Sequence, residues 1–130
     1  MATLITGGTG LIGACLAEKL LARGDRVVLL DQSPAEWRIR HLTEVAGDRL
    51  SVVRGDVCSL VDLLDALRSQ GASAIVHLAY VLGAESNASP ELATRVNIVG
   101  TANVLEAARL AGTQRVLLAS SIAVYGSDDR

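Results

Sequence analysis

Short apolar runs and helix-like segments alternate along the whole chain. The runs consist mainly of Val, Ile, Leu, Ala and Thr, and they show no alternation of apolar with polar positions. Runs of this kind are typical of strands that are buried on both faces of a parallel sheet. The expected strands comprise residues 2–6, 26–30, 50–53, 74–78 and 115–119.

Between these runs, apolar positions recur at spacings of three and four residues, which indicates helices. Glycine follows several of these segments, and serine or proline opens the later ones, as expected at helix ends. The expected helices comprise residues 11–23, 34–46, 59–70 and 89–110. The apolar stripe of the last helix is expected to consist of Ile98, Ala102, Leu105 and Ala108.

This alternation predicts an α/β fold, in which helices cover both faces of a parallel sheet. Right-handed crossovers restrict the topology, so the expected arrangement is a Rossmann-like, doubly wound sheet of at least five strands in the order 3-2-1-4-5. No linker or repeat divides the chain, and residues 1–130 are expected to form one domain.

Composition narrows the function classes. Half of the residues are hydrophobic, but Phe is absent and Trp and Tyr are few, so Ala, Val and Leu must form the core. The net charge of −2 gives no reason to expect nucleic acid or an anionic membrane as a partner. There is no signal-peptide pattern, so a cytoplasmic location is expected. Cys15 and Cys58 are expected to be buried free thiols, and no metal site is expected.

A glycine-rich stretch, TGGTGLIG, joins the first expected strand to the first expected helix. Gly7, Gly10 and Gly13 would let the backbone turn sharply, approach a phosphate and pack the helix on the strand. The helix start, at Leu11 and Ile12, would offer N–H groups to a pyrophosphate. A P-loop is excluded because the lysine and hydroxyl residue it requires after the last glycine are absent. The alternative is a purely structural turn.

Asp31 follows the second expected strand, near the offset of the acid that binds ribose in dinucleotide-binding folds. A carboxylate there accepts hydrogen bonds from the adenosine 2′- and 3′-hydroxyls and repels a 2′-phosphate. We therefore expect NAD in preference to NADP as the cofactor. One alternative is that Asp31 is a solvated acid at a strand end. Another is that Arg38 and Arg40 bind a phosphate, but this is less favoured because these two arginines lie inside the next helix.

Five motifs in order resemble those of the extended short-chain dehydrogenase/reductase family, which includes sugar-nucleotide epimerases and dehydratases. They are the glycine-rich stretch, GDV at 55–57, HLAY at 77–80, VNIVGT at 96–101 and SSIAVYG at 120–126. The resemblance covers essentially this whole chain, but only the first part of a complete family member. It implies a truncated domain that lacks the catalytic helix and the substrate-binding part.

The resemblance also implies roles for residues at the ends of the third and fourth strands. Asp56 should accept a hydrogen bond from the adenine amino group, and Val57 should touch the ring. Leu78, Ala79 and Tyr80 should line the path of the pyrophosphate and ribose. Tyr80 replaces the usual small residue of the family, which changes the pocket near the nicotinamide. Alternatively, Asp56 caps a turn.

Two further residues take roles from the resemblance. Asn97 should face the cofactor path and order the nearby loops, or alternatively bond backbone groups in the core. Ser121 should be the catalytic hydroxyl that binds the reacting substrate oxygen, or alternatively an ordinary loop serine. His77 is expected to be a satisfied strand-end histidine and not a catalyst, so a hydrolase built on it and Ser121 is disfavoured, also because no G-x-S-x-G elbow exists.

The family's base, a tyrosine in Tyr-x-x-x-Lys, has no counterpart in this chain. Lys19 is the only lysine, and Tyr125 belongs to the Val-Tyr-Gly motif, where it is expected to pack in the loop. The sequence thus predicts the cofactor-binding portion of an NAD-dependent epimerase, dehydratase or dehydrogenase acting on a sugar or sugar nucleotide, inactive by itself. The alternative is a non-catalytic dinucleotide-binding or sensing module. The resemblance implies a further helix that covers the sheet beside the helix at 89–110 and forms a dimer interface with it. Because that helix is missing here, a homodimer or self-association is expected.

Overall fold

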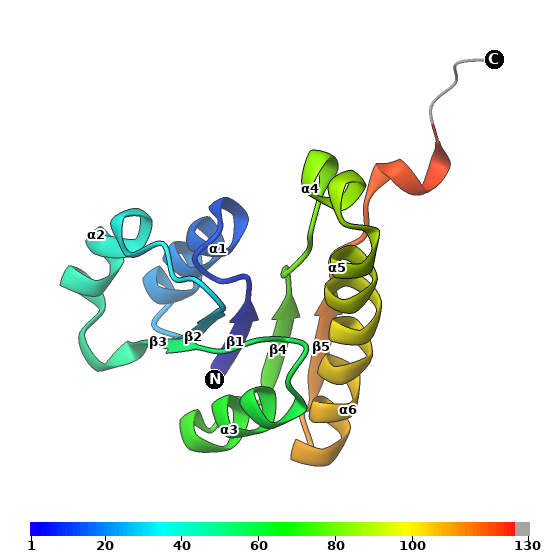
Figure 1. Ribbon diagram of the computed structural model, residues 1–130. Coiled ribbons are helices and arrows are strands. Elements are labelled where there is room, and N and C mark those ends of the chain that lie inside the picture. Colours follow the sequence, from blue (N-terminus) through cyan, green and yellow to red (C-terminus); the bar gives the residue numbers. More distant parts are fainter. Residues whose placement is uncertain (127–130) are drawn as a thin grey trace.

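A computed structural model describes residues 1–126 of the chain (Figure 1). Five parallel strands form one sheet in the order β3-β2-β1-β4-β5. This confirms the predicted fold class and strand order. The strands are β1 (Ala2–Thr6), β2 (Arg26–Asp31), β3 (Leu50–Arg54), β4 (Ala74–His77) and β5 (Arg115–Leu118).

Helices cover both faces of the sheet, with α1 and α2 on one face and α3 and α6 on the other. The helices are α1 (Leu11–Ala22), α2 (Glu36–Ala46), α3 (Leu60–Gln70), α4 (Gly83–Ala88), α5 (Pro90–Thr94) and α6 (Thr101–Ala111). A π-helical turn, Arg95–Gly100, joins α5 to α6, and 3-10 turns occupy Gly47–Arg49 and Ile122–Tyr125. The expected long helix therefore contains a π-helical turn, and the short helix α4 was not anticipated.

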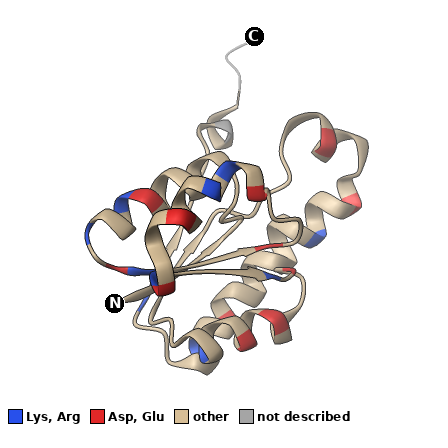
Figure 2. Cartoon of the chain, turned by 90° about the vertical axis from the view of Figure 1, so that its left-hand side faces the viewer, with Lys and Arg blue, Asp and Glu red and all other residues tan. Residues whose placement is uncertain are grey.

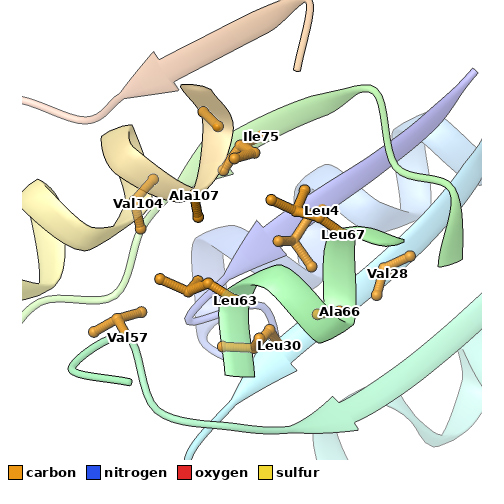
Figure 3. Packing of buried hydrophobic residues seen from close by; sticks show 11 residues of the cluster. Leu4, Val28, Leu30, Val57, Leu63, Ala66, Leu67, Ile75, Val104 and Ala107 are labelled. Atoms are coloured by element: carbon orange, nitrogen blue, oxygen red, sulfur yellow. The ribbon is translucent and has the colours of Figure 1, made fainter. Parts of the chain in front are cut away.

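Two clusters of small and branched apolar side chains form the core. Figure 3 shows the cluster in which α3 and α6 pack on the sheet, with Leu67 of α3 beside Leu4 and Leu63 directed toward Val57 and Val104. These leucines are fully buried, and burial of each contributes about 1.5–3 kcal/mol. The second cluster joins α1 and α2 to the other face and includes Ile5. The core thus forms without aromatic side chains.

The buried face of α6 contains Ala108 of the expected stripe but not its other members. Val104 and Ala107 are fully buried, whereas Ile98 and Leu105 are 65% and 47% exposed. Both sides of this helix are apolar, so spacing alone did not show which side meets the sheet.

The two thiols also differ from expectation. Cys15 is exposed on α1 and Cys58 is partly buried; both are free. The buried positions of α1 are Gly13, Ala14, Ala17 and Leu21, and Cys15 lies outside them.

Acidic and basic segments are interspersed in the view of Figure 2. Exposed ion pairs such as Arg109 with Glu106, 2.6 Å apart, add little to stability. Within the described residues, none of the helices has the length and apolar character that crossing a membrane requires.

Candidate functional site

The glycine-rich loop connects β1 to α1 in a conformation that larger residues could not adopt. Gly7 has φ of +63°, and a Cβ there would lie 2.9 Å from the backbone N of Ala79. A Cβ on Gly13 would lie 2.5 Å from the carbonyl oxygen of Gly8. Side chains at these positions would push apart the loop, β4 and α1, so glycine is required at both.

The N-terminus of α1 is open for an anion. Gly10 is its N-cap, no described side chain caps it, and no acidic residue lies in its first turn. The first N–H groups of a helix have no intrahelical acceptor, so those of Leu11, Ile12 and Gly13 are available. Together with the helix dipole they favour a negatively charged group such as a pyrophosphate.

A hollow of about 320 Å³ lies beyond the carboxyl ends of the strands, the edge toward which the arrowheads point in Figure 1. This is where ligands bind in doubly wound sheets. The charged residues that line it within the described chain are all acidic: Asp31, Asp56 and Glu85. The hollow brings together eight of the predicted site residues: Gly7, Gly10, Asp31, Asp56, Val57, Leu78, Ala79 and Tyr80.

Asp31 ends β2 and its carboxylate is held in place by neighbouring groups. Its Oδ2 accepts from the hydroxyl of Thr9 at 2.6 Å, and its Oδ1 accepts from the N–H of Ser33 at 3.2 Å. The carboxylate is therefore oriented, and it is not simply a solvated acid at a strand end. Arg38 reaches out of its helix and donates to the carbonyl oxygen of Thr9 at 3.0 Å, but it does not line the hollow.

Asp56 and Val57 form the turn after β3. Asp56 Oδ1 accepts from the N–H of Cys58 at 2.8 Å. Asp56 therefore caps this turn, as the alternative interpretation expected. Asp56 Oδ2 is 3.4 Å from the side-chain amide of Gln32, at the border of hydrogen bonding. Gly100 of the π-helical turn packs against Val57, and a Cβ there would lie 2.8 Å from Val57 Cγ2.

Asp62, in the first turn of α3, stabilises this same turn. Its carboxylate accepts from the N–H of Asp56 at 2.9 Å and from the hydroxyl of Ser59 at 2.8 Å. These two hydrogen bonds, the first being the larger cause, lower the pKa of Asp62. The Ser59 hydroxyl in turn accepts from the N–H of Asp62, which caps the helix as expected.

His77 is fully buried at the end of β4 and has a partner on each ring nitrogen. Nδ1 lies 2.6 Å from the hydroxyl oxygen of Thr6, and Nε2 lies 3.1 Å from that of Thr101. The Thr101 hydroxyl donates to the carbonyl oxygen of Asn97 at 2.7 Å, so it accepts from His77. Nε2 therefore carries the proton and Nδ1 accepts from Thr6. Burial lowers the pKa of His77.

This arrangement agrees with a structural role for His77. Neither ring nitrogen bonds a serine, and the ring is closed off from solvent. Because both ring nitrogens bond threonine hydroxyls, the imidazole has no free acceptor for a serine proton.

Asn97 orders the loop after β4. Its Oδ1 accepts from the N–H of Val81 at 2.9 Å, and its Nδ2 donates to the carbonyl oxygen of the same residue at 3.0 Å. The loop-ordering part of the prediction matches this geometry. Asn97 does not line the hollow, so a direct contact with a cofactor remains a prediction.

A second hollow, of about 720 Å³, continues from the first across the glycine-rich loop. Ser121 lines it, as do Leu11, Ile12 and Gly13, and it shares Gly7, Gly10, Leu78 and Tyr80 with the first hollow. The predicted catalytic hydroxyl thus lies along the same continuous surface as the predicted cofactor-binding residues. Leu11 and Ile12 expose their side chains here, at 71% and 68%.

Tyr125 corrects one expectation. Its side chain is 87% exposed and does not line either hollow, so it does not pack in the loop within the described structure. The residues that follow Gly126 lie outside the described part of the chain.

Sequence reasoning missed two residues that shape the site. Thr9 bonds Asp31, and Asn103 donates to the carbonyl oxygen of Val57 at 3.1 Å. The sequence offered one signal for each: Thr9 is a hydroxyl residue among glycines, and Asn103 is a polar residue in an otherwise apolar stretch of the helix.

Known proteins match the chain over nearly its whole length. A model of the NAD dependent epimerase/dehydratase family matches residues 3–130. A UDP-glucose 4-epimerase from Mycolicibacterium smegmatis and a D-erythronate dehydrogenase from Cupriavidus necator are each 38% identical over 98% and 97% of this chain. A solved dTDP-glucose 4,6-dehydratase from Streptomyces venezuelae, with NAD bound, covers all of this chain with 34% identity and a TM-score of 0.87.

The chain is shorter than these proteins. It spans 41% and 40% of the length of the first two and 42% of the solved dehydratase chain. The family model nevertheless matches almost every residue of the chain. The chain belongs to the NAD-dependent epimerase/dehydratase family.

Proposed function

We propose that this chain is the NAD-binding portion of an enzyme that transfers hydride to and from a sugar or sugar nucleotide. The observation that carries the proposal is the continuous hollow at the carboxyl ends of the strands. It has an uncapped helix N-terminus on one side and the oriented Asp31 carboxylate on the other. A dinucleotide has an anionic pyrophosphate and a ribose with hydroxyl donors, which match these two features.

The residues of the chain fit such a ligand. The N–H groups that begin α1 would hold the pyrophosphate. Gly10 lines the hollow and has no side chain that would stand between these groups and the ligand. Asp31 would accept from the adenosine ribose, and Asp56 and Val57 would contact the adenine. All three line the hollow.

Bound NAD would supply a nicotinamide that accepts a hydride and returns it. Ser121 lines the adjoining hollow, where its hydroxyl would orient the substrate oxygen that changes between alcohol and ketone. The proton of that oxygen needs a base whose pKa is tuned to neutral pH. The sequence contains no Tyr-x-x-x-Lys, so we propose that the 130-residue chain binds the cofactor without completing turnover.

The names of the relatives support the substrate class. Three of them act on UDP-glucose, D-erythronate and dTDP-glucose, so polyhydroxylated carbon chains are common to these three. Other relatives carry sterol names, among them a sterol-4-alpha-carboxylate 3-dehydrogenase from Bos taurus that is 38% identical over 92% of this chain. From the three polyhydroxylated substrates we propose a sugar or sugar-nucleotide substrate for the whole enzyme.

A paired substitution of glycines tests the cofactor site. Gly10 lines the hollow and has ordinary backbone angles, φ −67° and ψ 171°, so the backbone tolerates Gly10→Ala. The added Cβ would lie 3.1 Å from the Gly7 carbonyl oxygen, a tight contact that the loop must accommodate. Calorimetry should show NAD affinity reduced by about tenfold, the loss of one charge-assisted hydrogen bond. Gly24→Ala is the control, because Gly24 has φ of +84° and open space around it. It should lower stability by about 1–2 kcal/mol and leave NAD affinity unchanged. Equal NAD affinity of Gly10→Ala and the unmodified chain would contradict the proposed site.

A further inference from the structure

Thr9 lies in the middle of the glycine-rich loop. Its backbone and its side chain bond the last residue of β2 and the segment that follows. Its backbone N–H and its hydroxyl both donate to Asp31 Oδ2, over 3.2 Å and 2.6 Å. The hydroxyl oxygen accepts from the N–H of Ala35 at 3.0 Å, and the carbonyl oxygen accepts from Arg38 Nη1 at 3.0 Å. Thr9 is 1% exposed, so water does not compete for these bonds.

The direction of the hydroxyl bond is set by its partners. A backbone N–H can only donate, so the Thr9 oxygen must accept from Ala35 and keeps its single hydrogen for Asp31. The 2.6 Å distance is typical of a hydroxyl that donates to a charged carboxylate. Bonds of this kind are about twice as strong as those between neutral groups.

The bonds to Thr9 decide which part of Asp31 can meet a ligand. A carboxylate has about four acceptor positions on its two oxygens. The two bonds from Thr9 occupy Oδ2, and the N–H of Ser33 occupies one position on Oδ1. Among the described residues, no further donor to the Asp31 carboxylate is present, so one position on Oδ1 remains for a ligand in the hollow that Asp31 lines.

We propose that Thr9 is a positioning residue that sets the selectivity of this site for NAD over NADP, an inference that rests on the proposed NAD binding. Its hydroxyl fixes the Asp31 carboxylate so that Oδ1 accepts from a ribose hydroxyl and its negative charge opposes a 2′-phosphate. Without the hydroxyl, the carboxylate rotates toward water and both effects weaken. Arg38, the nearby cation, is held at the Thr9 carbonyl and 4.5 Å from the ring centroid of Trp37.

The only tryptophan of the chain, Trp37, provides the readout. Energy transfer from Trp37 to bound NADH reports occupancy, and competition with NAD and NADP gives the affinity of each. For Thr9→Val, we expect NAD affinity to fall about tenfold, equivalent to about 1.4 kcal/mol, and NADP affinity to change less. Thr9→Ser keeps the hydroxyl and should keep the NAD-to-NADP ratio of the unmodified chain.

A double substitution separates positioning from a general effect on the fold. In an Asp31→Ala background, Thr9→Val should leave the NAD-to-NADP ratio unchanged, because the carboxylate it would orient is gone. If Thr9→Val does not fold, Thr9→Ala takes its place, and failure of both to fold would overturn the inference by showing that Thr9 is needed for the fold itself.

The outcomes distinguish this inference from the proposed function. NADH binding with an unchanged NAD-to-NADP ratio in Thr9→Val would overturn the role of Thr9 alone. No NADH, NAD or NADP binding by the unmodified, folded 130-residue chain would overturn the proposed function, and the inference with it.

Discussion

The hydroxyl of Thr6, the last residue of β1, donates a hydrogen bond of 2.6 Å to Nδ1 of His77, the last residue of β4. This bond joins the two central strands at the edge of the sheet where the hollow begins. The same hydroxyl oxygen lies 3.2 Å and 3.4 Å from the N–H groups of Leu78 and Ala79, which line that hollow. A buried, neutral imidazole therefore helps to shape the proposed cofactor site.

Protonation of His77 should destabilise the fold. Burial lowers its pKa below the ordinary value near 6.5, so below that pH the unfolded chain binds a proton that the folded chain does not. Stability should then fall as the pH decreases from about 6.5, by at most about 1.4 kcal/mol per pH unit, until the folded-state pKa is reached. Urea denaturation between pH 8 and pH 5 measures this.

The other histidine offers a matched control. His41→Asn, at an exposed position, should keep the pH dependence, whereas His77→Asn should remove this contribution and lower stability at pH 8 by about 1–3 kcal/mol. The same pH slope in both variants would show that His77 is not its source.

The 130-residue chain should self-associate at high concentration. Ile98 and Leu105 are 65% and 47% exposed on the helical segment beside β5, and β5 is an edge strand with Leu117 52% exposed. Exposed apolar patches and open strand edges favour association. Sedimentation should show dimers or larger species, reduced by Ile98→Gln with Leu105→Gln but not by Val45→Gln on α2. A monomer at all concentrations tested would contradict this expectation.

The fold could be predicted from the sequence to the extent that local patterns determine it. Continuous apolar runs and the position of the glycine-rich loop were enough for the five strands and their order. Helix α4 lacks an apolar stripe, and a π-helical turn differs from an α-helical one by a single residue, so neither gives a periodic signal. Of the predicted apolar stripe, Ala108 is buried, but Ile98 and Leu105 are exposed, because Val104 and Ala107 meet the sheet instead.

The sequence indicated which residues line the candidate site, but not most of the hydrogen bonds that those residues form. Ser121 and the predicted cofactor residues other than Asn97 line the two hollows. Thr9 was overlooked because its bonds to Asp31 connect residues 22 positions apart, and only the fold brings them together. Asn97 bonds the backbone of the loop after β4. An amide side chain can form such bonds, but the motif around Asn97 does not indicate which backbone groups it meets.

An activity assay tests the proposal that the 130-residue chain binds the cofactor but does not complete turnover. With NAD and a panel of sugar nucleotides, aldoses and polyols, the absorbance of NADH should not rise, because the sequence lacks a tuned base for the substrate proton. Tyr125→Phe should change nothing, since its ring is 87% exposed and lies outside both hollows. Turnover that disappears in Tyr125→Phe would make this tyrosine the base and overturn the assignment.

NAD binding by the 130-residue chain is the central claim, and titration calorimetry with NAD and NADP tests it most directly. Asp31 lines the hollow with an oriented carboxylate, and the other charged residues that line the hollow in the described chain, Asp56 and Glu85, are also acidic. A hydrogen bond to a charged acceptor is worth about 1.5–3 kcal/mol, so NAD should bind at least about tenfold more tightly than NADP. Asp31→Ala should narrow that difference. NADP binding as tight as or tighter than NAD, or no NAD binding by the folded chain, would contradict the claim.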